Sequence, residues 1–319
     1  MNVKFGRSYR MTVAGRSSTP SAPINIEINF PLTLEFTITH NIFASANTAN
    51  FSMYNLSVDH RSEITFNQFL KARPYPVTLL AGYISEQPKG LYSDPAFLPT
   101  VFDGFANVAY TERVGSDLIT RINAIDNGDL TTGKAAGFFS GSGPDSYTAK
   151  PGTDFVTMVK AVMGHLTGGV KPGEVRIDAR QLPPPLPKER PFTGNVWQAL
   201  QDLAREANFA HVYIENGVCN MLGQDDVLLE TGSMGILRSE TGLLGVPRYT
   251  GNTIMVSSIF EPTLKIGARI ELKSEFNEDA NGMCKIVAYT HRGTMSGVSS
   301  REAISEITLM KLDTPLGHP

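Results

Sequence analysis

Residues 24–38, INIEINFPLTLEFTI, place an apolar side chain at every even position, and every odd position except Pro31 is polar. This period of two predicts a β-strand with one buried and one solvated face. Pro31 lacks an N–H donor, so it marks an edge, a bend or a bulge where the strand changes partner without losing its buried face. A second apolar run, Asn50–Leu56, follows a small and polar segment and can pair back on the first run. A long strand that stays one-sided through a bend predicts the wall of a β-barrel.

The β pattern continues on both sides of this strand as far as Asp126. Apolar segments bounded by glycine and proline predict further strands, and the last two form a hairpin that turns at Gly115. A short helix or turn is predicted over Val58–Leu70. The expected strands span Val3–Val13, Arg73–Gly82, Val101–Val108 and Asp117–Asp126. Residues 1–130 are therefore predicted to form an all-β domain.

Residues 131–235 differ in composition and predict a small α/β insert with two helices and a hairpin. Thr131–Thr148 is small, polar and rich in glycine, which is typical either of a mobile arm or of a segment clamped by a partner. The elements expected after it are a helix over Thr153–Leu166 with Thr153 as N-cap, an extended spacer around Pro183–Pro185, a helix over Val196–Ala207, and a hairpin over Ala210–Leu222 that closes at Asn216-Gly217.

From residue 236 the pattern returns to β-strands. The expected strands span Asn252–Phe260, Leu264–Ser274, Met283–Thr290 and Arg301–Lys311. Residues 236–319 are predicted to form a C-terminal β domain, and its short length leaves open whether strands of the N-terminal half complete it. The fold class predicted for the whole chain is mainly β with an α/β insert, so that one chain holds two β units.

Charge and composition exclude several classes of function. The formal net charge is −3 and no run of lysine and arginine occurs, whereas a protein that grips nucleic acid through phosphates needs a clustered basic surface. A slightly acidic surface suits a conduit through which DNA slides without sticking. No signal peptide begins at Met1 and no apolar run approaches the length of a membrane span, so we expect a protein made and used in a cytoplasm. Cys219 and Cys284 are predicted to be buried, reduced thiols.

Residues that could carry catalysis form no recognised pattern. Three carboxylate pairs are expected in polar turns, where they are solvated instead of being held on opposite sides of a substrate. The histidines are scattered, no cysteine pair has zinc spacing, and the glycines of residues 137–143 lack the Gly-Lys-Ser/Thr ending of a phosphate loop. The pairs are Asp225/Asp226, Asp126/Asp129 and Glu278/Asp279, and the histidines are His40, His60, His165, His211, His291 and His318.

Two further residue types were weighed as sites. His211 and Cys219 can approach each other across the predicted hairpin, but two ligands do not make a metal site. Trp197 lies on the apolar stripe of the second helix, where a core position is expected in preference to a platform for a sugar. The sequence therefore predicts no catalytic residue, no cofactor and no metal.

Taken in order, three passages of the chain resemble the baseplate hub proteins of contractile-tailed bacteriophages, which are related to the hub proteins of type VI secretion. The passages are Asn47–Ser57, Val101–Phe105 together with Ile119–Asp126, and Gly242–Gly293. The helix and hairpin over residues 196–222 also fit. These motifs are structural, so they indicate an assembly role by resemblance and identify no site.

The resemblance implies two tail-tube-like β-barrel domains in one chain, the second completed by residues 236–319. Three chains would then join into a ring of pseudo-sixfold symmetry. Such a homotrimer adapts a hexameric tail tube to a trimeric spike and lines the DNA channel. The implied partners are the tail tube protein, the spike protein and other baseplate proteins, and DNA passes through without specific binding. The implied location is the tail baseplate of a virion, assembled in the host cytoplasm.

The polar face of the first strand is the one surface to which the sequence assigns a role. In a ring, the unpaired edges of long strands are satisfied by neighbouring subunits. The polar face then lines the lumen, where threonine and carboxylate side chains repel phosphate, or it forms outer surface packed on other baseplate proteins or in contact with water. Its residues are Asn25, Glu27, Asn29, Thr33, Glu35, Thr37 and Thr39.

Two other functions remain open at this point. One is a hexameric tail-tube or distal-tail ring protein, although a single tube barrel needs far fewer than 319 residues. The other is a cell-wall hydrolase carried in the baseplate, which the lack of a carboxylate pair in a cleft disfavours. We therefore expect a structural hub without catalysis of its own.

Overall fold

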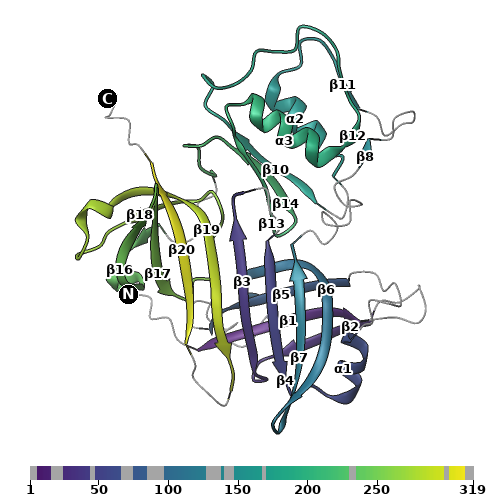
Figure 1. Ribbon diagram of the computed structural model, residues 1–319, viewed down its shortest axis with the longest axis vertical. Helices are drawn as coiled ribbons and strands as arrows, with labels where there is room; N and C mark the ends of the chain where they lie inside the picture. The colour runs from purple at the N-terminus through teal and green to yellow at the C-terminus, as the bar shows by residue number, and fades with distance from the viewer. Residues whose placement is uncertain are drawn as a thin grey trace.

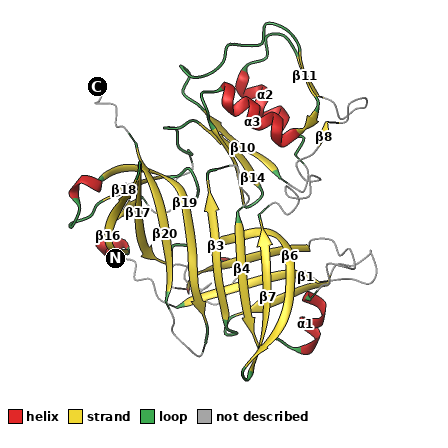
Figure 2. Ribbon diagram, viewed as in Figure 1, coloured by secondary structure: helices red, strands yellow, loops and turns green. Residues whose placement is uncertain are grey.

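The computed structural model describes residues 6–15, 24–43, 47–65, 75–84, 97–126, 138–139, 147–166, 170–229, 235–297 and 302–312. Strands make up most of these residues, and two helices lie together at one end of the molecule (Figure 2). The prediction of a mainly β fold with an α/β insert is confirmed. No helix in the described ranges is long and apolar enough to cross a membrane.

The N-terminal half consists of seven strands and one short helix around a common core. Its elements are β1 (Arg7–Gly15), β2 (Ile24–Asn29), β3 (Leu34–Asn41), β4 (Thr48–Tyr54), α1 (Val58–Ile64), β5 (Tyr75–Tyr83), β6 (Thr100–Val114) and β7 (Asp117–Ile125). All seven strands contribute buried apolar side chains to one cluster, together with Leu56 and Ile64. The predicted hairpin that turns at Gly115 is formed by β6 and β7, and the helix predicted after residue 58 is α1.

The stretch predicted as one long strand is two strands in different parts of the sheet. Alternation holds within β2 and β3, where Ile26, Ile28 and Leu34 are buried. It fails between them, because Phe30 is 37% and Leu32 is 40% exposed. The single-strand interpretation is therefore wrong. Pro31 ends the ladder because it has no N–H to donate, and the chain turns there to a new partner.

The C-terminal half adds its strands to the same sheet. Its elements are β15 (Ile236–Leu237), η4 (Ser239–Thr241), β16 (Leu243–Thr250), β17 (Thr253–Ile259), β18 (Arg269–Leu272), η5 (Glu278–Ala280), β19 (Gly282–Met295) and β20 (Ala303–Lys311). The strand order is β16-β17-β20-β19-β3-β4-β7-β6-β5-β1-β2, with β18 paired to β19 and β15 to β18. β3 and β19 are antiparallel from Leu34–Met295 to Asn41–Ala288, so one ladder joins the two halves (Figure 1).

The two halves repeat one strand order. In the order of the sheet, the set β16-β17-β20-β19 is followed by the set β3-β4-β7-β6. Each set consists of two hairpins, and corresponding strands take the same position in both sets. β6 has a register shift between Ala106 and Val108, and β19 has one between Ile286 and Ala288. A further antiparallel strand lies beside the first part of each long strand, β5 beside β6 and β18 beside β19. The halves are thus equivalent in topology down to the position of a bulge.

The insert forms a separate layer at the top of the molecule in Figure 1, with α2 and α3 over a three-stranded sheet. Its elements are β8 (Phe138–Phe139), β9 (Tyr147–Ala149), α2 (Phe155–Met163), β10 (Lys171–Arg176), β11 (Arg190–Phe192), β12 (Gly194–Asn195), α3 (Val196–Glu206), β13 (His211–Glu215) and β14 (Val218–Leu222). Both predicted helices and the Asn216-Gly217 hairpin are confirmed, the turn residues having φ of 48° and 76°.

Two details of the insert differ from the prediction. Asp154, not Thr153, caps α2, and its side chain accepts the Thr157 N–H. The residues before the Pro183–Pro185 spacer include a strand that was not predicted, β10, which pairs in parallel with β14. Most of the predicted arm Thr131–Thr148 lies outside the described residues.

Three clusters of buried apolar side chains underlie this architecture. The second cluster consists mainly of C-terminal residues, but it also contains Ile42 of the N-terminal half and Tyr213 and Leu222 of the insert hairpin. The first cluster likewise receives Phe260 and Met295 from the C-terminal half. The third holds α2 and α3 against β13 and β14. The first and second cores therefore include side chains from neighbouring parts of the chain, whereas the third consists of insert residues alone.

Candidate functional site

The structure divides the seven residues of the predicted polar face between two separate strands. Asn25, Glu27 and Asn29 lie on β2, at one end of the sheet order, whereas Glu35, Thr37 and Thr39 lie on β3 near its middle. Five strands separate β2 from β3 in that order. Thr33 lies in the turn between them, where its hydroxyl hydrogen-bonds that of Ser296 at 2.7 Å. Both groups alternate with core residues, so each points away from the first core.

The β2 group belongs to an edge of the sheet. Glu27 is partly exposed and pairs with Arg10 of the adjacent β1. No strand other than β1 pairs with β2 in the described part of the chain. This group is therefore not continuous with the β3 group.

The β3 group lies in a polar face that runs from β19 across β3 and β4 to β7. Thr37 lies between Arg292 of β19 and Asn50 of β4, and Thr39 hydrogen-bonds Thr290 at 3.2 Å. The face is hollowed by a depression of about 420 Å³. Its polar lining residues are Glu35, Thr37, Asn50, Ser52, Arg121, Arg292, Thr294 and Glu302. Because β19 and β7 belong to different halves, the two halves share this surface.

The charges on this face are balanced, which the sequence pattern alone did not predict. Arg121 pairs with Glu112 and donates to Ser52 Oγ at 3.0 Å. Arg292 donates to Glu306 Oε1 at 2.7 Å. Arg121 lies on β7, which pairs with β4, and Arg292 lies on β19, which pairs with β3. Only this strand pairing brings the two arginines onto the face. A guanidinium neutralised by a neighbouring carboxylate presents much less positive potential to a phosphate than an isolated one.

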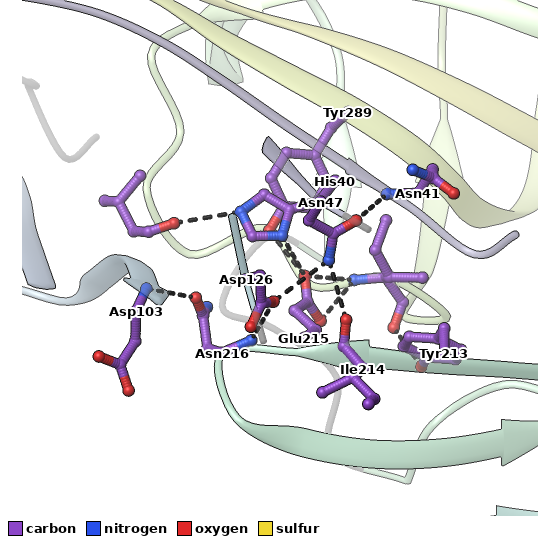
Figure 3. Close-up of polar contacts among 12 residues, drawn as sticks. His40, Asn41, Asn47, Asp103, Asp126, Tyr213, Ile214, Glu215, Asn216 and Tyr289 are labelled. Atoms are coloured by element: carbon purple, nitrogen blue, oxygen red, sulfur yellow. Dashed lines mark hydrogen bonds and ion pairs between the residues drawn. The ribbon is translucent and has the colours of Figure 1, made fainter. Parts of the chain in front are cut away.

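A second notable group of side chains is buried where the hairpin tip of the insert meets both β halves (Figure 3). Glu215, at the end of β13, accepts the Tyr289 hydroxyl at 2.7 Å and the Ile266 N–H at 3.1 Å. His40 Nδ1 lies 3.9 Å from Glu215 Oε1, and the His40 ring stacks on Tyr289 with centroids 4.8 Å apart. Residues from β3, β13 and β19 thus meet around one carboxyl group.

Asp126 and Asn47 form the other side of the same group. Asn47 donates from Nδ2 to Asp126 Oδ2 at 3.2 Å and to the Ile214 carbonyl at 2.9 Å, and its own oxygen accepts the Asn41 N–H. Asp126 also accepts the Asn216 N–H at 2.8 Å. The hairpin turn is therefore held by hydrogen bonds from the N-terminal half.

Burial determines the charge of this junction. It raises the pKa of Asp126 and of Glu215 to about 7 each, despite the hydrogen bonds that both accept. It lowers the pKa of His40 to about 4 and that of His291 to about 3. Asp126 Oδ1 and His40 Nδ1 have no hydrogen-bond partner in the described part of the chain. Because Asp126, Glu215 and His40 are all buried, the group is a structural contact between the hairpin and the two halves and not a catalytic cleft.

This junction corrects the prediction for Asp126. The pair Asp126/Asp129 was expected to be solvated in a turn, but Asp126 is fully buried, and Asp129 lies outside the described residues. Glu215 was not predicted at all, because a glutamate beside an Asn-Gly turn is ordinarily exposed. The run Val212–Glu215 is buried at each position, which only the packing of the hairpin tip reveals.

The remaining candidates are explained by local structure. Asp225 is exposed, and Asp226 accepts the Asp178 N–H at 3.0 Å. Glu278 and Asp279 are exposed residues of the short helix η5, whose Ala280 is buried. Trp197 is half-buried against the third core, as predicted. None of the three predicted carboxylate pairs therefore faces a cleft in the described ranges.

The histidines and cysteines form no ligand set. His211 is opposite Leu222 and Cys219 is opposite Ile214, so the predicted approach of His211 to Cys219 is wrong by the hairpin register. Both cysteines are buried free thiols, as predicted. Among the residues that the structure describes, no three histidine, cysteine or acidic side chains are grouped to hold a metal ion. His318 lies outside them.

The architecture defines the class of fold to which the chain belongs. No protein-family model matches the sequence, and no curated protein matches it either. The fold is that of phage and prophage tail proteins, and the resemblance predicted from three sequence passages is confirmed at the level of the fold.

Individual solved structures carry this assignment. The tail protein from Neisseria meningitidis MC58 is 9% identical, with a TM-score of 0.56 over 95% of this chain and 96% of its own. The 43 kDa tail protein of prophage MuSo2 from Shewanella oneidensis is 10% identical, with a TM-score of 0.54 over 97% and 100%. A chain of the lidded Francisella PdpA–VgrG complex matches at 9% identity and a TM-score of 0.52, over all of this chain and 55% of its own.

Proposed function

We propose that this protein is a structural component of a phage tail: the baseplate hub, a homotrimeric adaptor between the hexameric tail tube and the trimeric spike. The observation that carries the proposal is the repeated strand order of the two halves, joined head to tail in one sheet. The tail proteins that share the fold support a structural role. No enzymatic role is proposed, since the described carboxylates either face solvent or are buried without access.

The head-to-tail junction is the geometric basis of a ring. β19, the last strand of one four-stranded set, pairs with β3, the first strand of the other. Contacts of this kind are heterologous, and repeating them with a suitable rotation generates a closed ring. Because one chain supplies two sets, three chains would supply six. A ring with six similar units from three chains matches a sixfold tube on one side and a threefold spike on the other.

We propose three units along the chain, residues 1–130, 131–235 and 236–319, each built around one of the three apolar clusters. The first and third are the tube-like barrel domains, and the insert docks between them through its hairpin tip. Side chains that cross between the clusters would keep the two barrel units from turning independently.

We propose that the polar face on β19, β3, β4 and β7 lines the DNA channel. Its threonines, its asparagine and its paired charges offer no net attraction to a passing phosphate backbone. Of the seven predicted residues, this assigns Glu35, Thr37 and Thr39 to the lumen. Asn25, Glu27 and Asn29 lie five strands away, and we assign them to the outer surface.

The partners follow from the position of such a ring. Tail tube protein would bind one rim and the spike the other, with further baseplate proteins outside, and the assembled protein would be part of the virion tail. The likeness to a chain of a PdpA–VgrG complex supports a partner of the spike kind.

The mass of the purified protein in solution, measured by light scattering with and without co-expressed tube and spike proteins, tests the proposal. A trimer of the 34.7 kDa chain is expected. A hexamer would favour a tail-tube or distal-tail ring protein instead. A stable monomer that clears peptidoglycan would replace the structural role with that of a cell-wall hydrolase.

A further inference from the structure

We infer that β6 of one chain pairs edge to edge with β16 of a second copy, with Glu112 opposite Arg248, Val114 opposite Leu244 and Tyr110 opposite Thr250. This contact rests on the ring of the proposed function and names the surface that closes it. β6 is the counterpart of β19 and β16 is the counterpart of β3, and β19 and β3 are already paired with each other within the chain. The strand that pairs with β6 in the same way is therefore β16 of another copy.

Both strands have an unoccupied side in the described structure. β5 pairs only with Thr100–Ala106 of the 15-residue β6, so no described strand lies beside Asn107–Val114 on the side away from β7. β16 is the last strand of the sheet order and pairs with β17 alone. An exposed edge of this length is a template for pairing with another chain.

The C-terminal half shows what belongs beside such an edge. β18 pairs with the start of β19, from Gly282 to Lys285. β3 pairs with the rest of β19, from Ala288 to Met295. The rest of β6 is the equivalent segment, because it also follows a bulge. The strand equivalent to β3 is β16, which begins the second four-stranded set. β6 and β16 lie at opposite ends of the eight-stranded run, so they meet only between copies.

Cross-strand pairs fix the register. On β3, Glu35, Thr37 and Thr39 are opposite Ser52, Asn50 and Thr48 of β4. On β16, Leu244, Arg248 and Thr250 are opposite Ser257, Met255 and Thr253 of β17, the equivalent positions. In β19 the partners of the three β3 residues are Thr294, Arg292 and Thr290. Counted from the two bulges, the equivalents of these in β6 are Val114, Glu112 and Tyr110.

The side chains that this register brings together are complementary. Arg248 is exposed and would lie opposite the carboxylate of Glu112, which already contacts Arg121 of its own chain. Val114 is 51% exposed and Leu244 is 36% exposed, so both are large apolar side chains without full cover. Opposite charges and apolar pairs facing each other across an antiparallel ladder stabilise it, whereas like charges destabilise it.

One local contact limits how far the pairing runs. Asn277 Nδ2 donates to the Pro247 carbonyl at 3.1 Å, and Pro247 has no N–H of its own. β16 also holds extra residues between Leu244 and Arg248 relative to β3. We therefore place the contact in two parts, Arg248–Thr250 and Leu244, on either side of this bulge.

Disulfide trapping tests the register directly in the full chain. Directly opposite residues of an antiparallel pair have Cα atoms about 4.5–5.5 Å apart, within the range of a disulfide. The double variants V114C/L244C and Y110C/T250C should form covalent dimers and trimers on mild oxidation, and Cys219 and Cys284 do not interfere because they are buried. The matched control Y110C/L244C uses the same strands out of register and should not cross-link, and neither should the single variants.

A charge exchange provides an independent readout that does not depend on oxidation. Arg248→Glu should weaken subunit association by about tenfold at low salt, and Glu112→Lys added to it should recover part of that loss. Arg180→Glu, the same change at an exposed arginine of the insert, is the control that should leave association unchanged.

The outcomes separate this contact from the proposed function. Trimers that cross-link only through the in-register pairs support the inference. If the protein is a trimer by mass but cross-links equally through Y110C/L244C, or through neither in-register pair, this contact is wrong. The proposed trimeric adaptor is not affected by that result. Absence of any trimer, with the variants folded as judged by circular dichroism, overturns both.

Discussion

At the level of single residues, Asp126, Glu215, His40 and His291 are expected to make the stability of the protein depend on pH. Burial raises the pKa of the two carboxyl groups and lowers that of the two imidazoles. Between about pH 4.5 and pH 7 the folded state retains carboxyl protons that the unfolded state releases, so stability falls as pH rises. The histidines act with the opposite sign between about pH 4 and pH 6.5, and the two effects partly cancel there.

Glu215→Gln should reveal the carboxyl contribution. Glutamine keeps an oxygen to accept from Tyr289 and Ile266 but does not ionise. Relative to the unchanged protein, the variant should gain about 2–4 kcal/mol in free energy of unfolding as pH rises from 5 to 8, since it avoids burying a charge. Urea unfolding at a series of pH values measures this difference. If the free energy of unfolding changes with pH in the same way for both proteins, Glu215 does not ionise in the folded state between pH 5 and pH 8.

Asn47 is expected to matter more than its size suggests. It bonds Asn41, Asp126 and Ile214, and so links the N-terminal half to the insert hairpin. Asn47→Ala should cost about 2–3 kcal/mol in free energy of unfolding, because buried groups lose their partners. Denaturant unfolding measures the cost, and amide hydrogen exchange should rise at β13. A loss confined to global stability, with β13 exchange unchanged relative to the other strands, would contradict the linking role.

At the scale of elements, the hairpin β13–β14 depends on its turn. Asn216 and Gly217 both have positive φ, and a Cβ at residue 217 would meet nothing within 4 Å. Gly217→Ala should therefore destabilise the protein by about 1 kcal/mol through backbone strain alone. Gly235→Ala is the matched control, because that position is equally open and its φ is not positive. Equal thermal stability of both variants would refute the strain argument.

The sequence predicted those elements that depend on local interactions and not those that depend on contacts between distant parts of the chain. The helices, the Asn-Gly hairpin and the alternation within β2 and β3 are local, and these predictions are confirmed. The joining of β3 to β19 is not local, because the two strands lie on opposite sides of the insert and nothing in INIEINFPLTLEFTI specifies a partner. Pro31 did predict a change of partner, but alternation could not show which strands the new neighbours are or that Phe30 and Leu32 leave the buried face.

The polar surfaces were predicted to the same degree. Periodicity placed Glu35, Thr37 and Thr39 outside the core, which is confirmed, but it could not show that Asn25 and Glu27 lie on a different part of the sheet. Arg121 and Arg292 join the β3 group through register alone. Asp126 and Glu215 were beyond sequence reasoning, because burial of an acidic side chain beside a turn depends on what packs over it.

At the scale of the whole molecule, the proposed channel can be tested with two matched glutamates. Glu35 lies on the face shared by both halves and Glu27 on the distant β2. Glu35→Lys should slow DNA delivery by assembled particles, because the three chains of the ring would each place one lysine in a narrow channel and attract phosphate there. Glu27→Lys should leave delivery unchanged. Kinetics of DNA release from purified particles measure both, and equal effects of the two variants would contradict the assignment of the lumen face.

In the proposed ring, each chain carries two equivalent halves. The measurement that tests it most directly is the rotational symmetry of end-on averaged images of the assembled protein, recorded without imposed symmetry. Three chains with two topologically equivalent sets each predict a strong sixfold component with a weaker threefold one, the latter caused by the inserts and by the differences between β3 and β16. A threefold pattern without a sixfold component, or a sixfold pattern built from six chains, would contradict the claim.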